Sequence, residues 1–146
     1  MKTSIKKTLL LASIFTIMAS ATQVFAAFDS IEKTPKGTTF QSFNVHVPGW
    51  NGSGTTGIQT KGTIGASAQI QSFRSGSYVN TDVRQNYSYV GASYHGPWLR
   101  NLNNNQSSYT VPTNANHPSG SDTKLEFSSD ITTTAAYDVT GEWRSN

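Results

Sequence analysis

The sequence predicts an all-β protein, an antiparallel β-sandwich or a small barrel, preceded by the helix of a signal peptide. Three observations lead to this prediction. Short segments of alternating apolar and polar residues follow one another along the chain, and clusters of Gly, Pro, Asn and Ser separate them. No stretch after residue 26 has the periodicity of an amphipathic helix. Segments of this kind are typical of sandwiches and small barrels.

Residues 1–26 have the three parts of a secretory signal peptide. Three lysines lie within the first seven residues, residues 8–22 carry no charge, and Ala26 ends a small-residue cleavage motif. The uncharged run is shorter than the roughly 20 apolar residues of a membrane-spanning helix. We therefore expect cleavage after Ala26, secretion of the remaining chain, and a mature form that does not span a membrane.

Removal of this segment also removes the excess positive charge. The whole chain has 11 Lys and Arg and 8 Asp and Glu, and three of the lysines precede the cleavage site, so eight residues of each sign remain. Nucleic acids and anionic membranes are bound by clustered Lys and Arg, so no nucleic-acid partner is expected. The chain contains no cysteine, so its stability must come from a hydrophobic core rather than from disulfides.

Residues 27–37 combine charged residues with Pro and Gly and show neither period, which predicts a flexible lead-in. A single β-sandwich domain is expected over residues 38–146. Its first strand, residues 39–47, has Phe43, Val45 and Val47 alternating with polar residues, and a turn-rich loop at residues 48–54 follows. Phe40 has the opposite parity, which predicts either a bulge or a ring that covers the sheet edge.

The longest alternating pattern covers residues 58–72. Ile58, Ile64, Ala66, Ala68 and Ile70 share one parity, and most of the polar residues occupy the other. This pattern predicts one long bent strand, or two strands in line, with the isoleucines on the inner face.

A hairpin is predicted next, with strands at residues 78–84 and 87–94 and a turn at Gln85-Asn86. Residues 101–122 are rich in Asn, Ser and Pro, and they are predicted to be a loop with one short strand at residues 108–111.

Two consecutive strands are predicted to close the domain. The odd-numbered apolar positions share one parity almost to the C-terminus, and the two strands are joined near Ser129-Asp130. The residues with this parity are Leu125, Phe127, Ile131, Ala135, Tyr137, Val139 and Trp143.

Residues that could carry catalysis or hold a metal ion form no recognised pattern. The three histidines, His46, His95 and His117, lack the short spacing of a zinc site. The sequence has no G-x-S-x-G motif, no calcium-binding loop and no convincing carboxylate pair for glycoside hydrolysis. We therefore predict a protein that is not an enzyme and needs no metal or cofactor.

Aromatic and amide side chains are concentrated between Tyr78 and Tyr109. Tyrosine and tryptophan have flat apolar faces with a polar group, and amides both donate and accept hydrogen bonds, as sugar or protein recognition requires. The candidate binding residues are Trp50, Tyr78, Tyr94, Trp98 and Tyr109. Under the alternative interpretation, the tyrosines only pack across strands and the amides form a solvated loop.

We consider two functions that follow directly from these features. The first is a secreted binding module that recognises cell-wall polysaccharide or another extracellular protein through its loop aromatics. The second is an extracellular structural or matrix protein that assembles through strand edges, since long alternating strands with few charges can pair between chains.

A third function rests on a resemblance. The short, cysteine-free chain is rich in Gly, Asn and Tyr, and together with its closing segment Val139–Trp143 it resembles the small secreted β-sandwich bacteriocins of the lactococcin 972 type. The resemblance implies an antibacterial protein. Because the mature chain is neutral, killing would require a receptor such as a cell-wall precursor rather than attraction to anionic membranes.

Overall fold

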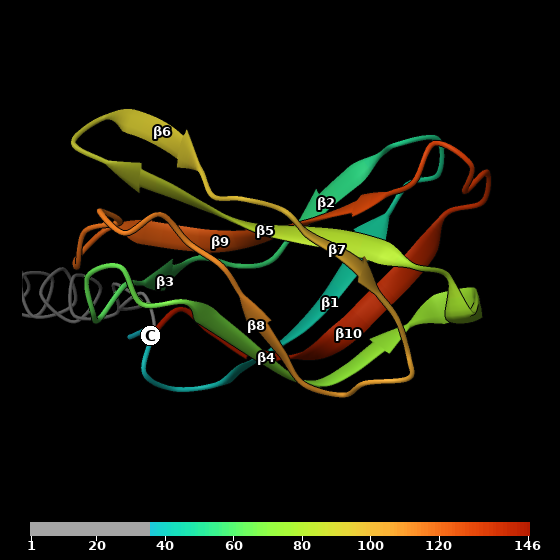
Figure 1. Cartoon of the computed structure of the whole chain (residues 1–146), viewed down its shortest axis with the longest axis horizontal. Coiled ribbons are helices and arrows are strands. Elements are labelled where there is room, and N and C mark those ends of the chain that lie inside the picture. Colours follow the sequence, from blue (N-terminus) through green and yellow to red (C-terminus); the bar gives the residue numbers. More distant parts are fainter. Residues whose placement is uncertain (1–35) are drawn as a thin grey trace, which may run out of the picture. The chain divides into compact units, whose positions relative to one another are not determined.

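Two antiparallel β-sheets face each other in the computed structural model of the chain, which describes residues 36–146 (Figure 1). The prediction of an all-β antiparallel fold is confirmed. The predicted signal peptide and residues 27–35 of the predicted lead-in lie outside the described residues. At the end of that lead-in, the Gly37 amide donates to the Thr60 carbonyl at 2.7 Å, and the Gly37 carbonyl accepts from the Asn146 amide at 2.7 Å.

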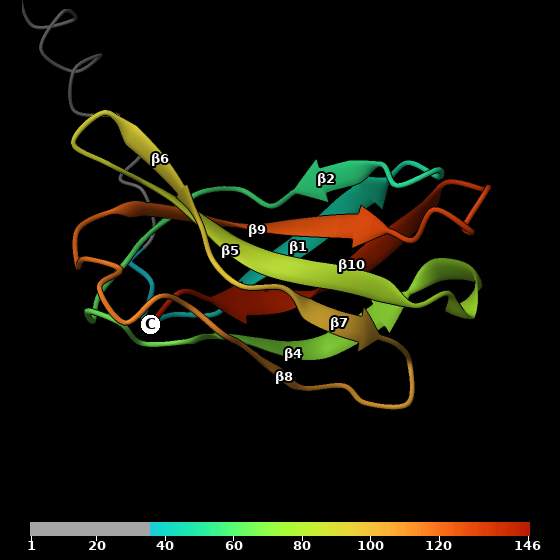
Figure 2. The same ribbon diagram turned by 45° about the horizontal axis from the view of Figure 1, so that its top comes forward.

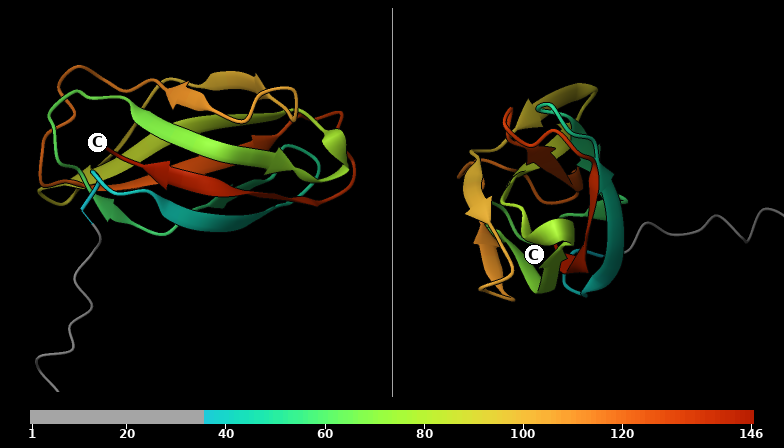
Figure 3. Two further views of the ribbon diagram at one scale, coloured as in Figure 1. Left: turned by 90° about the horizontal axis from the view of Figure 1, so that it is seen from below. Right: turned by 90° about the vertical axis from the view of Figure 1, so that its right-hand side faces the viewer.

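Within residues 36–146, ten strands form the two sheets, and one short 3₁₀ turn connects two of them. The four-stranded sheet has the order β1 (Gln41–Val47), β10 (Tyr137–Arg144), β4 (Ala68–Ser75) and β8 (Tyr109–Val111), seen side by side in Figure 3. The six-stranded sheet has the order β2 (Ser53–Thr55), β9 (Asp122–Ser129), β5 (Thr81–Tyr89) and β6 (Ala92–His95), with β3 (Gln59–Thr60) on β9 and β7 (Leu99–Leu102) on β5. The 3₁₀ turn η1 (Gly76–Tyr78) joins β4 to β5.

Alternating side chains of β1, β9 and β10 form most of the core, as the sequence predicts. The buried hydrophobic residues on these strands are Phe43, Val45, Val47, Leu125, Phe127, Tyr137, Val139 and Trp143. The two remaining apolar positions of that predicted parity, Ile131 and Ala135, are exposed in the loop between β9 and β10. Phe40 lies just before β1, where the Arg144 guanidinium stacks 4.8 Å from its ring centroid.

The predicted strand over residues 58–72 is wrong. β3 and β4 belong to different sheets, and residues 61–67 connect them. Ile58 and Ile64 are 49% and 64% exposed, whereas the polar Gln59 is buried. The side-chain nitrogen of Gln59, Nε2, donates to the Trp143 backbone carbonyl at 2.8 Å. The buried Gln59 side chain therefore has a partner for its donor group.

β4 changes its inward parity at a β-bulge. Before Ser72 the even-numbered residues point inward, and after it Phe73 and Ser75 do. The register with β10 shifts between Thr140 and Glu142, so that two residues of β4 lie opposite Gly141 alone. Ser72 has a φ of 55°, in the left-handed region. The bulge turns Phe73 into the core.

The predicted hairpin exists, but its turn is elsewhere. β5 continues through Gln85 and Asn86, and the turn to β6 lies at Val90-Gly91, where both residues have positive φ values of 49° and 78°. Gln85 is buried because its side-chain amide donates to the Val111 carbonyl at 3.0 Å. In the predicted loop over residues 101–122, β7 ends at Leu102 and β8 matches the expected short strand.

Replacement of Gly141 with alanine is expected to destabilise the fold by about 1 to 3 kcal/mol, because a Cβ there would lie 2.9 Å from the Gln71 carbonyl oxygen and 3.0 Å from Phe43 Cζ. Urea unfolding followed by far-UV circular dichroism measures this loss. Gly57→Ala is the matched control, because a Cβ at Gly57 would meet no atom within 4 Å. Equal unfolding midpoints for the two variants would contradict this account of the bulge.

Candidate functional site

The outward-facing side chains of β5 form a row along the outer surface of the six-stranded sheet, where β5 lies between β9 and β7 (Figure 2). These are Asp82, Arg84, Asn86 and Ser88, which alternate with the inward-facing Thr81, Val83, Gln85 and Tyr87. Asn86 is itself buried, because neighbouring side chains cover it. Their partners on β9 are Ser128, Glu126, Lys124 and Asp122, in that order. We call this row and the side chains that contact it the β5 track.

A polar hollow of about 500 Å³ lies at the Asp82 end of the β5 track. We call it the loop-end hollow. Its lining comes from η1, β5, β7 and the β9–β10 loop, and comprises Tyr78, Val79, Asn80, Asp82, Arg100, Asn101, Asp130, Thr132 and Thr133. Tyr78 is 83% exposed at its rim.

Both carboxylates of the loop-end hollow are held by hydrogen bonds. Asp82 accepts from the backbone amide of Asn101 at 3.0 Å and from the Arg100 guanidinium. Asp130 accepts from the Thr132 amide at 3.0 Å and from the Thr132 hydroxyl at 3.2 Å, and these bonds hold the pKa of Asp130 below its usual value. Asp130 is therefore ionised at neutral pH, and both carboxylates are fixed in position.

Trp98 lies at the centre of the β5 track, and its ring lies near the guanidinium groups of Arg84 and Arg100. The Arg84 guanidinium carbon lies 4.4 Å from the Trp98 ring centroid and that of Arg100 lies at 5.3 Å, within the range of cation–π attraction. Glu126 Oε2 accepts from Arg84 Nε at 2.8 Å and from Asn86 Nδ2 at 2.5 Å. Burial raises the pKa of Glu126, but these hydrogen bonds outweigh it and leave the pKa below its usual value.

A second, smaller hollow of about 190 Å³ lies at the Ser88 end of the β5 track. We call it the hairpin hollow, because β5 and β6 form much of its lining. The lining residues are Ile58, Asn86, Tyr87, Ser88, Ser93, Tyr94, His95, Asp122, Thr123 and Lys124. The His95 ring is fixed by Asn86, with 2.8 Å between Nδ1 and Oδ1.

Three of the five residues that the sequence singles out lie on the β5 track or its hollows. Tyr78 lines the loop-end hollow, Trp98 occupies the centre, and Tyr94 lines the hairpin hollow. The Tyr94 ring stacks on Tyr87 with 4.9 Å between centroids, and Tyr87 stacks in turn on His117 at 3.7 Å.

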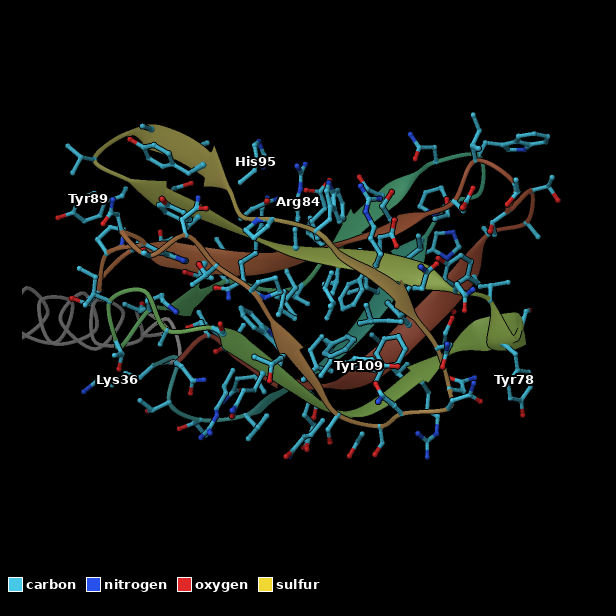
Figure 4. The ribbon with its side chains drawn as sticks, in the orientation of Figure 1. Lys36, Tyr78, Arg84, Tyr89, His95 and Tyr109 are labelled. Atoms are coloured by element: carbon cyan, nitrogen blue, oxygen red, sulfur yellow. The ribbon has the colours of Figure 1, made fainter. Side chains whose placement is uncertain are left out.

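The other two residues lie elsewhere. Trp50 is 69% exposed in the β1–β2 loop, where its amide donates to the Thr133 carbonyl at 2.7 Å, but its side chain lines neither hollow. Tyr109 packs edge-on against Phe73, and its hydroxyl donates to the Asn103 carbonyl at 2.8 Å. Figure 4 shows Tyr109 over the interior and Tyr78 at the end of the domain.

Sequence reasoning did not identify the charged residues of the β5 track. Asp82 and Arg84 share the outward parity of the predicted strand at residues 78–84, so the alternation itself contained a signal. Because a turn was predicted at Gln85-Asn86, the predicted strand contained only Asp82 and Arg84 of this row. The partners Arg100 and Glu126 come from strands 18 and 42 residues away from the residues they contact, which no local pattern reveals.

No family model and no curated protein matches the chain. Among solved structures, the chain is similar to TmCBM61 in complex with beta-1,4-galactotriose, with a TM-score of 0.34 and 7% sequence identity. The match covers 75% of this chain and 88% of that chain. A similarity this low assigns no function to the chain.

Within residues 36–146, no group of three or more His, Asp and Glu side chains is placed to hold a metal ion. The three histidines occupy different surroundings: His46 contacts Asp138 on the four-stranded sheet, His95 lies in the hairpin hollow, and His117 is buried. The same residues contain no helix with the length and apolar character of a membrane span.

His117 is part of a closed polar cluster rather than an open site. Its Nδ1 lies 2.8 Å from Thr113 Oγ1, and its Nε2 lies 2.9 Å from Ser121 Oγ. Burial, and then the positive charge of Lys61, lower the pKa of His117 to about 4. Lys61 is itself buried, donates to the Ser145 carbonyl at 2.5 Å, and has its pKa lowered by burial to about 8.

Acid is expected to destabilise the domain through His117. A solvated histidine, as in the unfolded chain, has a pKa of 6.5, whereas the pKa of His117 in the fold is about 4, so the unfolded chain binds more protons between these values. The free energy of unfolding therefore falls as the pH drops from 6.5 to 4, by up to about 3 kcal/mol from this residue. Denaturant unfolding across this pH range measures the loss.

The matched control for this experiment is the exposed His46. His117→Gln is expected to flatten the pH dependence over this range, whereas His46→Gln is expected to retain it. If the free energy of unfolding of the His117 variant still falls with pH as steeply as that of the unmodified chain, another group is responsible for the acid sensitivity.

Proposed function

We propose that the chain binds a carbohydrate and that the loop-end hollow is the binding site. The observation that supports this most is the exposed ring of Tyr78 beside a hollow lined with carboxylate, guanidinium, amide and hydroxyl groups. Sugar rings present both apolar C–H faces and hydroxyl groups that donate and accept hydrogen bonds. A flat aromatic face and planar polar side chains are complementary to these two features.

The two carboxylates of the loop-end hollow are already fixed before a ligand arrives. Asp82 uses its two oxygens for Arg100 and Asn101, and Asp130 is held by Thr132. Each carboxylate oxygen has more than one lone pair, so both can still accept from a sugar hydroxyl. Because the side chains are preorganised, binding would cost little conformational entropy.

The backbone at the rim of the loop-end hollow adopts rarely populated conformations. Ser77 and Tyr78 both have a φ of 55°, and Asn101 has a φ of 61°. Non-glycine residues in the left-handed region carry strain, and such residues cluster at binding sites. The strain at Tyr78 supports a role for this exposed ring in binding.

The predicted signal peptide agrees with this proposal. A secreted domain would meet polysaccharides of a cell wall or of the extracellular space. The proposed partner is therefore an extracellular polysaccharide.

The purified chain is expected to bind at least one of a panel of soluble polysaccharides, including galactan, xylan, mannan, glucan and solubilised peptidoglycan, in calorimetry and affinity electrophoresis. Tyr78→Ala is expected to weaken that binding about tenfold, because the aromatic face is lost, which corresponds to about 1.4 kcal/mol. The matched control is Tyr89→Ala, since Tyr89 is a 45% exposed tyrosine at the opposite end of the domain and lines neither hollow (Figure 4). The proposal is overturned if no polysaccharide binds, or if the two variants bind equally well.

A further inference from the structure

Outward-facing side chains of the same strand, β5, contribute to the lining of both hollows. Asp82 lines the loop-end hollow, and Asn86 and Ser88 line the hairpin hollow. An extended strand rises about 3.3 Å per residue, so the row from Asp82 to Ser88 is about 20 Å long. Figure 4 shows Arg84 and His95 close together on one side of the sheet and Tyr78 farther along, at the end of the domain. The hollows are thus connected by an outward row of side chains rather than separated by an edge of the sheet.

The surface between the hollows has the same chemistry as the hollows themselves. Trp98 contributes a half-buried indole at the centre, beside the Arg84 guanidinium, and Arg84 and Asn86 in turn donate hydrogen bonds to Glu126. Arg84 and Glu126 have side chains that are 22% and 14% exposed, so they form a firm floor rather than a layer of mobile side chains. A chain of repeating sugar units would meet aromatic and polar groups along its whole length.

The hairpin hollow is suited to the same kind of ligand. Ile58 is 49% exposed and supplies an apolar surface. Asp122, Lys124 and the Asn86–His95 pair supply acceptors and donors. This combination of an apolar surface with a few polar groups matches that of the loop-end hollow, where Tyr78 supplies the apolar surface.

The charges along the β5 track argue against an anionic polymer. Arg84 is paired with Glu126, and Arg100 is paired with Asp82. The track and its two hollows contain four acidic residues, Asp82, Asp122, Glu126 and Asp130, and three basic residues, Arg84, Arg100 and Lys124. A polyanion is bound by unpaired cationic groups, which release its counterions, and here both guanidinium groups already have an acidic partner.

We infer that the ligand is a linear, uncharged polysaccharide whose chain runs from the loop-end hollow along the β5 track to the hairpin hollow. This inference rests on the proposed function, because it assigns a ligand class and a second subsite to the same carbohydrate-binding surface. Longer chains make more contacts in one binding event, and affinity therefore increases with chain length.

The test uses isothermal titration calorimetry with four series of neutral oligosaccharides, built from galactose, xylose, mannose or glucose, each from the disaccharide to the hexasaccharide. In the series that binds, the hexasaccharide is expected to bind at least about tenfold more tightly than the disaccharide. Asp122→Ala, at the far hollow, is expected to reduce this hexasaccharide-to-disaccharide affinity ratio about threefold or more, because only the long chain reaches both hollows.

Asp138→Ala is the matched control. Asp138 is also an exposed carboxylate on a strand, but it lies on the outer face of the four-stranded sheet, where it contacts His46. This variant is expected to leave both affinities unchanged. Urea unfolding of both variants verifies that each is folded.

The outcomes separate this inference from the proposed function. Binding that does not increase from the disaccharide to the hexasaccharide, or a ratio that Asp122→Ala leaves unchanged, overturns the extended track and leaves carbohydrate binding at the loop-end hollow intact. Absence of binding in all four series, with absence of binding to the polysaccharide panel, overturns both. Tighter binding of an anionic polysaccharide such as polygalacturonate than of any neutral series overturns the assigned ligand class.

Discussion

The position of Phe127 in the middle of the interior determines how the two sheets of the domain fit together. With no cysteine in the chain, no disulfide links the sheets, and side-chain packing with a few buried hydrogen bonds holds them together. Phe127 of β9 stacks on Phe43 of β1 with 5.3 Å between ring centroids, and on Phe73 of β4 with 6.3 Å. Truncation of a buried ring of this size costs about 3 to 5 kcal/mol, a large part of the stability of a small domain. Because Phe127 pairs with Val83, its inward orientation also turns Val83 inward and leaves Asp82 and Arg84 outward. The core therefore sets which side chains form the β5 track.

The β-bulge in β4 is a requirement of this packing rather than an irregularity. If β4 kept the parity of Ala68 and Ile70, Phe73 would point to solvent and Phe127 would lose one of its two aromatic contacts. The extra residue at Ser72 corrects the parity, and Gly141 opposite it leaves space for the Phe43 ring. A strand that must change parity midway needs a bulge, and the residue types that permit one are small.

Alternation predicted the fold correctly where one face of a strand is buried among apolar side chains, as in β1, β9 and β10. It failed where polar side chains are buried with hydrogen-bond partners from distant residues. Gln59 and Gln85 both lie inside because their amides bond to backbone groups 84 and 26 residues away, and a period-two pattern assigns such residues to the surface. The same limit applies to the site. Tyr78, Tyr94 and Trp98 stood out as residue types, but the pairing of Arg84 with Glu126 depends on strand order, which the sequence does not reveal.

The ion pairs on the β5 track fit the proposed carbohydrate binding better than they fit a role in stability. Ion pairs near the surface stabilise proteins by about 0 to 1 kcal/mol, and partial burial of Glu126 and Arg84 also carries a desolvation penalty. Each of the two pairs has one member on β5, and both guanidinium groups contact the Trp98 ring. These pairs therefore add little stability to a sheet that the hydrophobic core already holds in place. The ion pairs suit a binding surface, because each pair fixes the direction of its remaining lone pairs and N–H groups while its two charges cancel. Rigid, directional and nearly neutral polar groups around an aromatic ring are what a neutral ligand with many hydroxyl groups requires.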